Sequence, residues 1–145
     1  MSKLYTRAAR TSNVTSGEAT WELRSGTNSR LYIRELGIFM GAATASTFGL
    51  GRPAAIGITP TTPVVGQAHD PADAAGIGAT ALAWATKPTT PTSSIYLRRI
   101  GLPAAIGAGV IWTFNEPLIV SVSSSIVVYN LATNGVADIY VTWEE

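Results

Sequence analysis

The sequence predicts an all-β protein, a single-domain β-sandwich or barrel that is jelly-roll-like in topology. Three observations favour this class. About eight or nine short β-prone segments are separated by turn residues, no stretch sustains the 3.6-residue period of a long helix, and two parts of the chain repeat each other. Residues 31–37 (LYIRELG) match 95–101 (IYLRRIG), and 51–57 (GRPAAIG) match 101–107 (GLPAAIG), in the same order. Two similar halves are compatible with two Greek keys, although a local repeat does not fix topology.

Composition limits the classes of function. The chain has 145 residues, which is the size of one domain, and a net charge of +1, which is too small for a general nucleic-acid binder. It contains no cysteine, so disulfides and thiol chemistry are excluded. No apolar run approaches the ~20 residues that span a bilayer, so we expect no membrane partner. Charged residues make up 13% of the chain, against about 25% in soluble domains, which favours lasting contact with other proteins.

The first 17 residues are expected to form an N-terminal arm that leaves a β-domain of residues 18–145. Basic side chains precede a polar run at residues 11–17, which gives the segment reach. Its candidate protein-binding residues are three cations and two apolar anchors: Lys3, Arg7, Arg10, Leu4 and Tyr5. The alternative is that residues 3–10 form the first strand of the sandwich.

Residues 19–24, 30–41 and 46–50 are the next predicted strands. The first alternates cleanly, with Ala19, Trp21 and Leu23 facing inward and Thr20, Glu22 and Arg24 facing outward.

The second of these strands changes phase. Leu31 and Ile33 fall on one face, whereas Leu36 falls on the other. One extra residue, a β-bulge at Arg34-Glu35, would return all of them to one buried face. The repeat places a second bulge at Arg98-Arg99. A central strand that is apolar on both faces explains the same pattern, and both explanations stay open.

A long Pro/Gly-rich loop is expected at residues 51–78, with one helical turn beginning at Asp70-Pro71. Residues 79–86 are then predicted to form a strand with one all-alanine face at positions 79, 81, 83 and 85. Residues 118–122 are the next expected strand after 95–114.

The last two predicted strands are residues 126–133 and 136–143. They flank Asn134-Gly135, a dipeptide typical of the type I′ turn of a hairpin, so we expect them to pair with each other.

The sequence offers little catalytic chemistry. It has one histidine, His69, in the Pro/Gly-rich loop, and its carboxylates are scattered, so we expect no enzyme activity, no metal and no cofactor. The four tryptophans fall on apolar strand faces and are expected to pack in the core. Arg98 and Arg99 complete the set of candidate protein-binding residues, because arginine is favoured at interfaces.

Three segments carry a family resemblance: residues 31–39 (LYIRELGIF), 105–114 (AIGAGVIWTF) and 140–145 (YVTWEE). They are similar to segments of small virion structural proteins of tailed bacteriophages, and the similarity covers roughly residues 30–145. The resemblance implies a capsid decoration, or cement, protein, which is assembled in the bacterial cytoplasm and located on the virion. It implies the major capsid protein as partner and self-association, most often as a homotrimer. The alternatives are a head- or tail-fibre knob that binds host glycans, a head–tail adaptor, and a non-viral carbohydrate-binding module.

Overall fold

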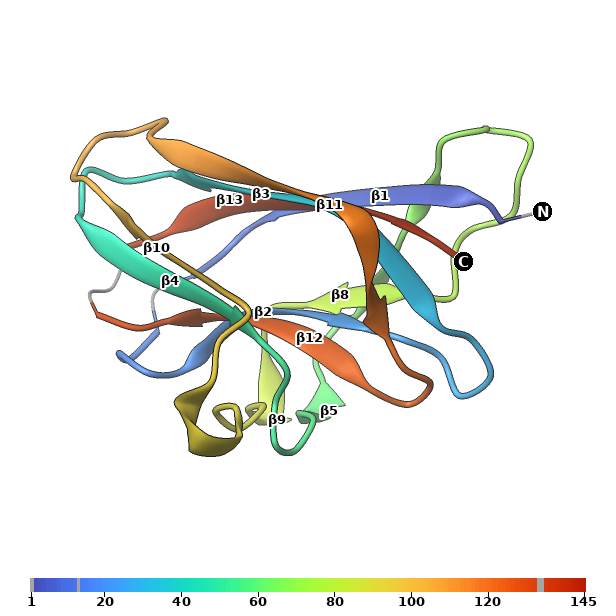
Figure 1. Ribbon diagram of the computed structural model, residues 1–145, viewed down its shortest axis with the longest axis horizontal. Helices are drawn as coiled ribbons and strands as arrows, with labels where there is room; N and C mark the ends of the chain where they lie inside the picture. Colours follow the sequence, from blue (N-terminus) through green and yellow to red (C-terminus); the bar gives the residue numbers. More distant parts are fainter. Residues whose placement is uncertain (1, 13, 133–134) are drawn as a thin grey trace.

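A computed structural model of the chain describes residues 2–12, 14–132 and 135–145. Two antiparallel sheets pack face to face, which confirms the predicted all-β sandwich (Figure 1). The first sheet has the strand order β11-β3-β13-β1-β7, the second has β10-β4-β12-β2-β8-β6, and β5 pairs separately with β9. The elements are β1 (Leu4–Arg10), β2 (Ala19–Arg24), β3 (Leu31–Met40), β4 (Ser46–Gly51), β5 (Ile58–Pro60), β6 (Val64–Val65), β7 (Gln67–Ala68), β8 (Ala79–Ala81), β9 (Trp84–Thr86), the 3-10 turn η1 (Thr92–Ser94), β10 (Arg98–Leu102), β11 (Gly109–Val120), β12 (Ser125–Asn130) and β13 (Ala137–Glu144).

The longer strands pair in a nested order. β1 pairs with β13, β2 with β12, β3 with β11, and β4 with β10, so the first four strands pair with the last four in reverse order. Two further pairs, β3 with β13 and β4 with β12, complete the two sheets. Strands that lie far apart in the sequence are therefore neighbours throughout the core.

Residues 52–97, here called the insertion, connect β4 to β10 and close one side of the sandwich. Within it, β7 pairs with β1, β8 pairs with β2, and β6 pairs with β8. In Figure 1 the green part of the insertion lies beside both chain termini. The opposite side ends in β11 and β10, each hydrogen-bonded on one side only among the described residues, and we call this pair of strands the open edge.

The bulge predicted in β3 is confirmed at Arg34. Thr142 of β13 pairs with Glu35 and the next residue, Trp143, pairs with Ile33, so Arg34 has no partner in that ladder. Since one residue is added, Ile33 and Leu36 both face the core, and both are fully buried.

The second predicted bulge, at Arg98-Arg99, is wrong. β10 pairs with β4 without a register shift, from Arg98 opposite Leu50 to Leu102 opposite Ser46. Ile95 is 68% exposed, and Leu97, which packs against the core, lies before β10 begins at Arg98, so no bulge within the strand is needed.

The predicted pairing of residues 126–133 with 136–143 is also wrong. β12 lies in the second sheet, between β2 and β4, whereas β13 lies in the first, between β1 and β3. Asn134 itself lies outside the described residues. A favourable turn sequence acts only locally, whereas each of these apolar strands gains more by taking a central place in its own sheet, with partners on both sides.

The expected N-terminal arm is wrong for residues 4–10. These residues form β1, which pairs with β13 over its whole length, from Leu4 opposite Glu144 to Arg10 opposite Asp138. The first-strand alternative describes this segment, because an extended chain with apolar Tyr5 on one side completes a sheet better than it projects into solvent.

The single alanine-faced strand over residues 79–86 is corrected to two short strands, β8 and β9. The break at residues 82–83 turns the chain, so Ala81 is buried while Ala83 and Ala85 are exposed. The helical turn expected at Asp70 is a hydrogen-bonded turn, in which the Asp70 carboxylate accepts from the backbone N–H of Ala72 at 2.9 Å.

β2 has the predicted inward face, but its outer face is covered as well. Glu22 is fully buried under Trp84, whose indole N–H donates to the Glu22 carboxylate. The Arg24 guanidinium donates to the same carboxylate at 3.0 Å and to the carbonyl oxygen of Gly57. The outward orientation expected for Glu22 therefore does not mean exposure, because the insertion folds over this face. A fully buried, ionised carboxylate is destabilising without a cation beside it, and Arg24 is the cation that pairs with Glu22.

Candidate functional site

The seven predicted protein-binding residues do not form one site. The five N-terminal ones lie on or next to β1, on the side that the insertion closes. Arg98 and Arg99 lie on β10 at the open edge, on the other side of the sandwich, and both are exposed. The Arg98 guanidinium lies 5.4 Å from the centre of the Phe114 ring of β11, so it spans from one sheet to the other.

Lys3, Leu4 and Tyr5 contact the chain's own insertion and C-terminal strand. The Lys3 ammonium forms an ion pair of 2.6 Å with Asp73, and the hydrogen bond to Asp73 raises the pKa of Lys3. The carbonyl oxygen of Leu4 accepts from the backbone N–H of His69 at 2.9 Å. Tyr5 is 4% exposed and stacks on Trp143, so it anchors this side of the sandwich rather than a partner.

Arg10 is paired on the outer face of the first sheet. Its guanidinium donates two hydrogen bonds of 2.8 Å to the two carboxylate oxygens of Asp138. The hydrogen bond from Arg10 lowers the pKa of Asp138 below its ordinary value of 3.8. A lowered carboxyl pKa means that the folded state favours the ionised form.

The stability contribution of this pair is therefore expected to depend on pH. It is complete above the ordinary pKa of 3.8 and is lost as the pH falls through the lower folded-state pKa. Urea denaturation should show that Asp138→Asn is less stable than the wild type near neutral pH, and that this difference shrinks well below pH 3.8. Arg10→Met, which removes the other partner of the pair, should lose the same pH-dependent stability relative to the wild type. A difference that is constant over the pH range would contradict the assignment.

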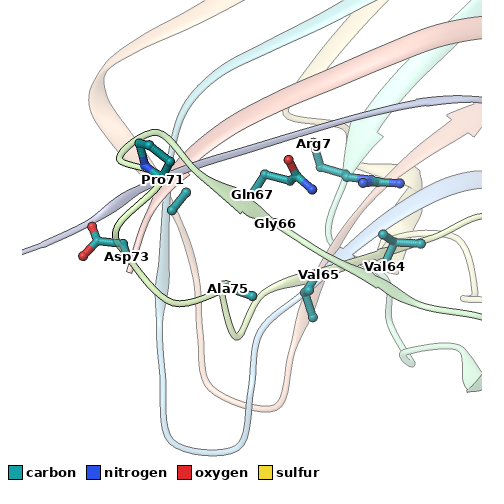
Figure 2. Close-up of a pocket in the computed structure, with 9 residues that line it drawn as sticks. Arg7, Val64, Val65, Gly66, Gln67, Pro71, Asp73 and Ala75 are labelled. Carbon is teal, nitrogen blue, oxygen red and sulfur yellow. The ribbon is translucent and has the colours of Figure 1, made fainter.

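Arg7 is the one predicted site residue that lines a cavity. Side chains alternate along β1, and Arg7 shares its face with buried Tyr5 and sits opposite buried Val141, so it points between the sheets. The cavity has a volume of about 380 Å³ and is bounded mainly by the insertion (Figure 2). Its lining residues are Arg7, Val64, Val65, Gly66, Gln67, Ala68, Pro71, Asp73 and Ala75.

The second candidate surface is apolar and lies on the outer face of the first sheet at its open edge. Register places two exposed isoleucines of β11 beside aromatic residues of β3 and β13. We call this surface the β11 patch, and it consists of Tyr32, Phe39, Ile111, Ile119 and Tyr140. Ile111 is 51% exposed and Ile119 is 41% exposed, so each has apolar area left to bury.

The aromatic members of the β11 patch are held by their own neighbours. Phe39 and Tyr140 stack on each other, with ring centres 6.4 Å apart, and the Tyr140 ring covers Gly37 so closely that a Cβ there would lie 2.1 Å from it. The Tyr140 hydroxyl donates to Glu35 at 2.5 Å. Burial, followed by this hydrogen bond, raises the pKa of Tyr140 to about 12, so the phenol stays neutral.

Two ion pairs within the chain lie beside the β11 patch. Arg10 binds Asp138, and Arg34 binds Glu144 at 2.8 Å. The hydrogen bond from Arg34 lowers the pKa of Glu144. These four charges are matched within the chain, whereas Glu35 accepts from Tyr140 and Glu116 of β11 is in none of the ion pairs of the described residues. The patch therefore offers a partner mainly apolar area, with two carboxylates beside it.

The β11 patch was not predicted from the sequence. Residues 109–114 read GVIWTF, an apolar run that is compatible with a strand buried on both faces. In the structure Val110 and Trp112 are half-buried against the core, whereas Ile111 is exposed because β11 is an edge strand. Only long-range strand order distinguishes these cases.

Comparison with known proteins identifies no relative: no family model, curated protein or solved structure matches the chain. Within residues 2–12, 14–132 and 135–145, no three His, Cys, Asp or Glu side chains are grouped closely enough to hold a metal ion. No helix in this part of the chain has the length and apolar character needed to cross a membrane.

Proposed function

We propose that the protein is a non-enzymatic virion structural protein, a decoration or cement protein that binds the outer surface of a tailed-phage capsid. Its partner is the major capsid protein, and it stabilises the shell by burying surface across several capsid subunits. The nested strand pairing supports this proposal, because pairing of the first four strands with the last four in reverse order is compatible with a jelly roll, an architecture common in viral capsid domains.

The observation that carries the proposal is the β11 patch. It combines exposed aliphatic side chains with two internal ion pairs at the open edge of a charge-poor chain. Unpaired edge strands and exposed apolar area together are typical of a protein–protein contact. We propose that this patch is the surface that contacts the capsid shell. A protein that binds only the assembled shell stabilises the shell by mass action.

A glycan-binding fibre knob is the second candidate. Such a knob needs exposed aromatic rings on which sugars stack. In the described residues the large exposed hydrophobic side chains are all isoleucine or valine. The aromatic residues at the β11 patch are stacked on each other or half-buried, so the surface favours a protein partner over a glycan.

The proposed function is tested with particles assembled with and without the chain. Particles that lack it should form normally but release their DNA at a lower temperature, measured with a DNA-binding dye, and adding the purified protein should restore the higher temperature. Unchanged DNA release together with lost adsorption to host cells would contradict a decoration protein and identify a fibre knob.

We further propose that the protein is a homotrimer. The support is the charged fraction of 13%, since a free monomer of this size usually carries about twice that fraction. The single alanine face that also suggested self-association is not formed, because β8 and β9 are separate strands. Sedimentation velocity at micromolar concentration should give the mass of three chains of 15.2 kDa. A single species at the monomer mass would refute the trimer.

A further inference from the structure

Arg7 is an arginine without an anion. Its Nε atom is buried and has no hydrogen-bond partner, and none of the ion pairs formed by the described residues includes Arg7. Asp73, the acidic residue that lines the same cavity, is engaged elsewhere, since it binds Lys3. The residue as a whole is half-buried, but a buried donor atom without a partner costs free energy, so native structures normally supply an acceptor.

The space around Arg7 is shaped for a small ligand. Arg7 and Val64 line both the cavity of about 380 Å³ and a second one of about 240 Å³, so the guanidinium lies where the two approach each other. Figure 2 shows the Arg7 guanidinium on the side of the view where Val64 lies, with Gln67 on the segment between Val65 and Pro71. Apart from Gln67 and Asp73, whose carboxylate is paired with Lys3, the walls are apolar or carry hydroxyl groups. The residues beyond those in the first cavity are Ala9, Thr61, Thr62, Thr80, Leu82 and Ala83.

The backbone beside this space is strained. Thr59 and Thr62 have φ angles of 47° and 44°, in the left-handed region that β-branched residues rarely adopt. Such strain costs free energy and clusters at ligand clamps, and Thr62 lines the second cavity. The insertion therefore places a strained backbone segment next to Arg7, whose Nε atom has no hydrogen-bond partner.

We propose that this cavity binds a carboxylate carried on a short aliphatic group, with Arg7 as the residue that pairs with it. The guanidinium donates hydrogen bonds to the carboxylate oxygens, and the valine and alanine walls cover the aliphatic part. Two sources have this chemistry, a free short-chain carboxylic acid and the C-terminal carboxylate of an apolar peptide. The site is on the other side of the sandwich from the β11 patch, so it is independent of the proposed capsid contact.

The test measures binding of hexanoate and of 1-hexanol, its uncharged analogue of equal chain length, to the full chain. NMR titration should show that the wild type binds hexanoate at least about tenfold more tightly than 1-hexanol, with the largest shift changes at residues 64–68. Arg7→Met should abolish this preference, and Arg7→Lys should retain part of it. Arg10→Met is the matched control, because Arg10 lies on the same strand with its partner Asp138 on the outer face, and it should leave the preference unchanged.

A second arm separates the two sources. A tripeptide of valine and alanine is compared as the free acid and as the C-terminal amide, and tighter binding of the free acid than of hexanoate identifies a peptide terminus. Equal binding of hexanoate and 1-hexanol by the wild type, or an unchanged preference in Arg7→Met, would overturn the proposal. The comparison of acid and alcohol in the wild type decides the question even if an Arg7 variant fails to fold.

Discussion

Replacing Arg24 with methionine is expected to destabilise the protein by about 3 kcal/mol, measured by urea denaturation. The reason is Glu22, whose side chain is fully buried and whose carboxylate would lose the one cation that it has among the described residues. Breaking one partner of a buried pair leaves an uncompensated charge, which costs about 3–5 kcal/mol. The Arg24 side chain is 20% exposed, so water reaches part of the pair and the lower end of that range applies.

Arg10→Met, in the first sheet, is the control for this variant, and adding Glu22→Gln to Arg24→Met is the rescue. Arg10→Met breaks an ion pair whose side chains are 63% and 49% exposed, so its cost should be much smaller than that of Arg24→Met. Glu22→Gln combined with Arg24→Met removes both charges and keeps an acceptor for the Trp84 indole N–H, and should recover more than half of the loss. Equal costs for Arg24→Met and Arg10→Met would show that Glu22 is not the buried charge described above.

Replacing Ile111 and Ile119 together with glutamate is expected to weaken binding to capsid particles by at least about 100-fold, measured by co-sedimentation. Each isoleucine has roughly half of its side chain left to bury, which is worth about 1 kcal/mol, and each buried unpaired carboxylate adds a further cost. Because both side chains are exposed at an edge strand, the variant should remain folded and trimeric.

Ile58→Glu is the matched control for this variant. Ile58 is 59% exposed, more than either isoleucine of the β11 patch, and it lies on β5 in the insertion. The substitution should leave particle binding within about twofold, because effects on surfaces outside an interface are small. If Ile58→Glu weakens binding as strongly as the double variant, the contact surface is not the β11 patch.

The sequence predicted where the strands lie better than which strands pair. Period-two alternation marked β2 correctly, and the phase change in β3 predicted the bulge at Arg34, since both signals come from neighbours in the chain. The β12–β13 pairing failed because strand order depends on contacts between distant segments, and a turn-forming dipeptide does not determine them. The same limitation explains the second bulge, which assumed that residues 95–101 are as buried as residues 31–37.

The candidate site was harder to predict than the fold. Arg7 was expected on an arm, but it occupies an inward position of a strand whose polar and apolar residues do not alternate regularly. Its cavity forms only when the insertion, distant in sequence, folds back beside β1. Ile111 and Ile119 were not predicted as surface residues, and they are exposed because they lie on the outer face of β11 at the edge of its sheet.

The central claim, that this protein is a capsid decoration protein that binds through the β11 patch, is tested most directly by cryo-electron microscopy of particles that carry it. The account predicts density for the sandwich on the outer surface of the shell, over junctions between major capsid subunits, with Ile111 and Ile119 facing the shell. Density at the tail, at a fibre tip or at the head–tail junction would contradict it, as would a sandwich on the shell with β11 facing solvent.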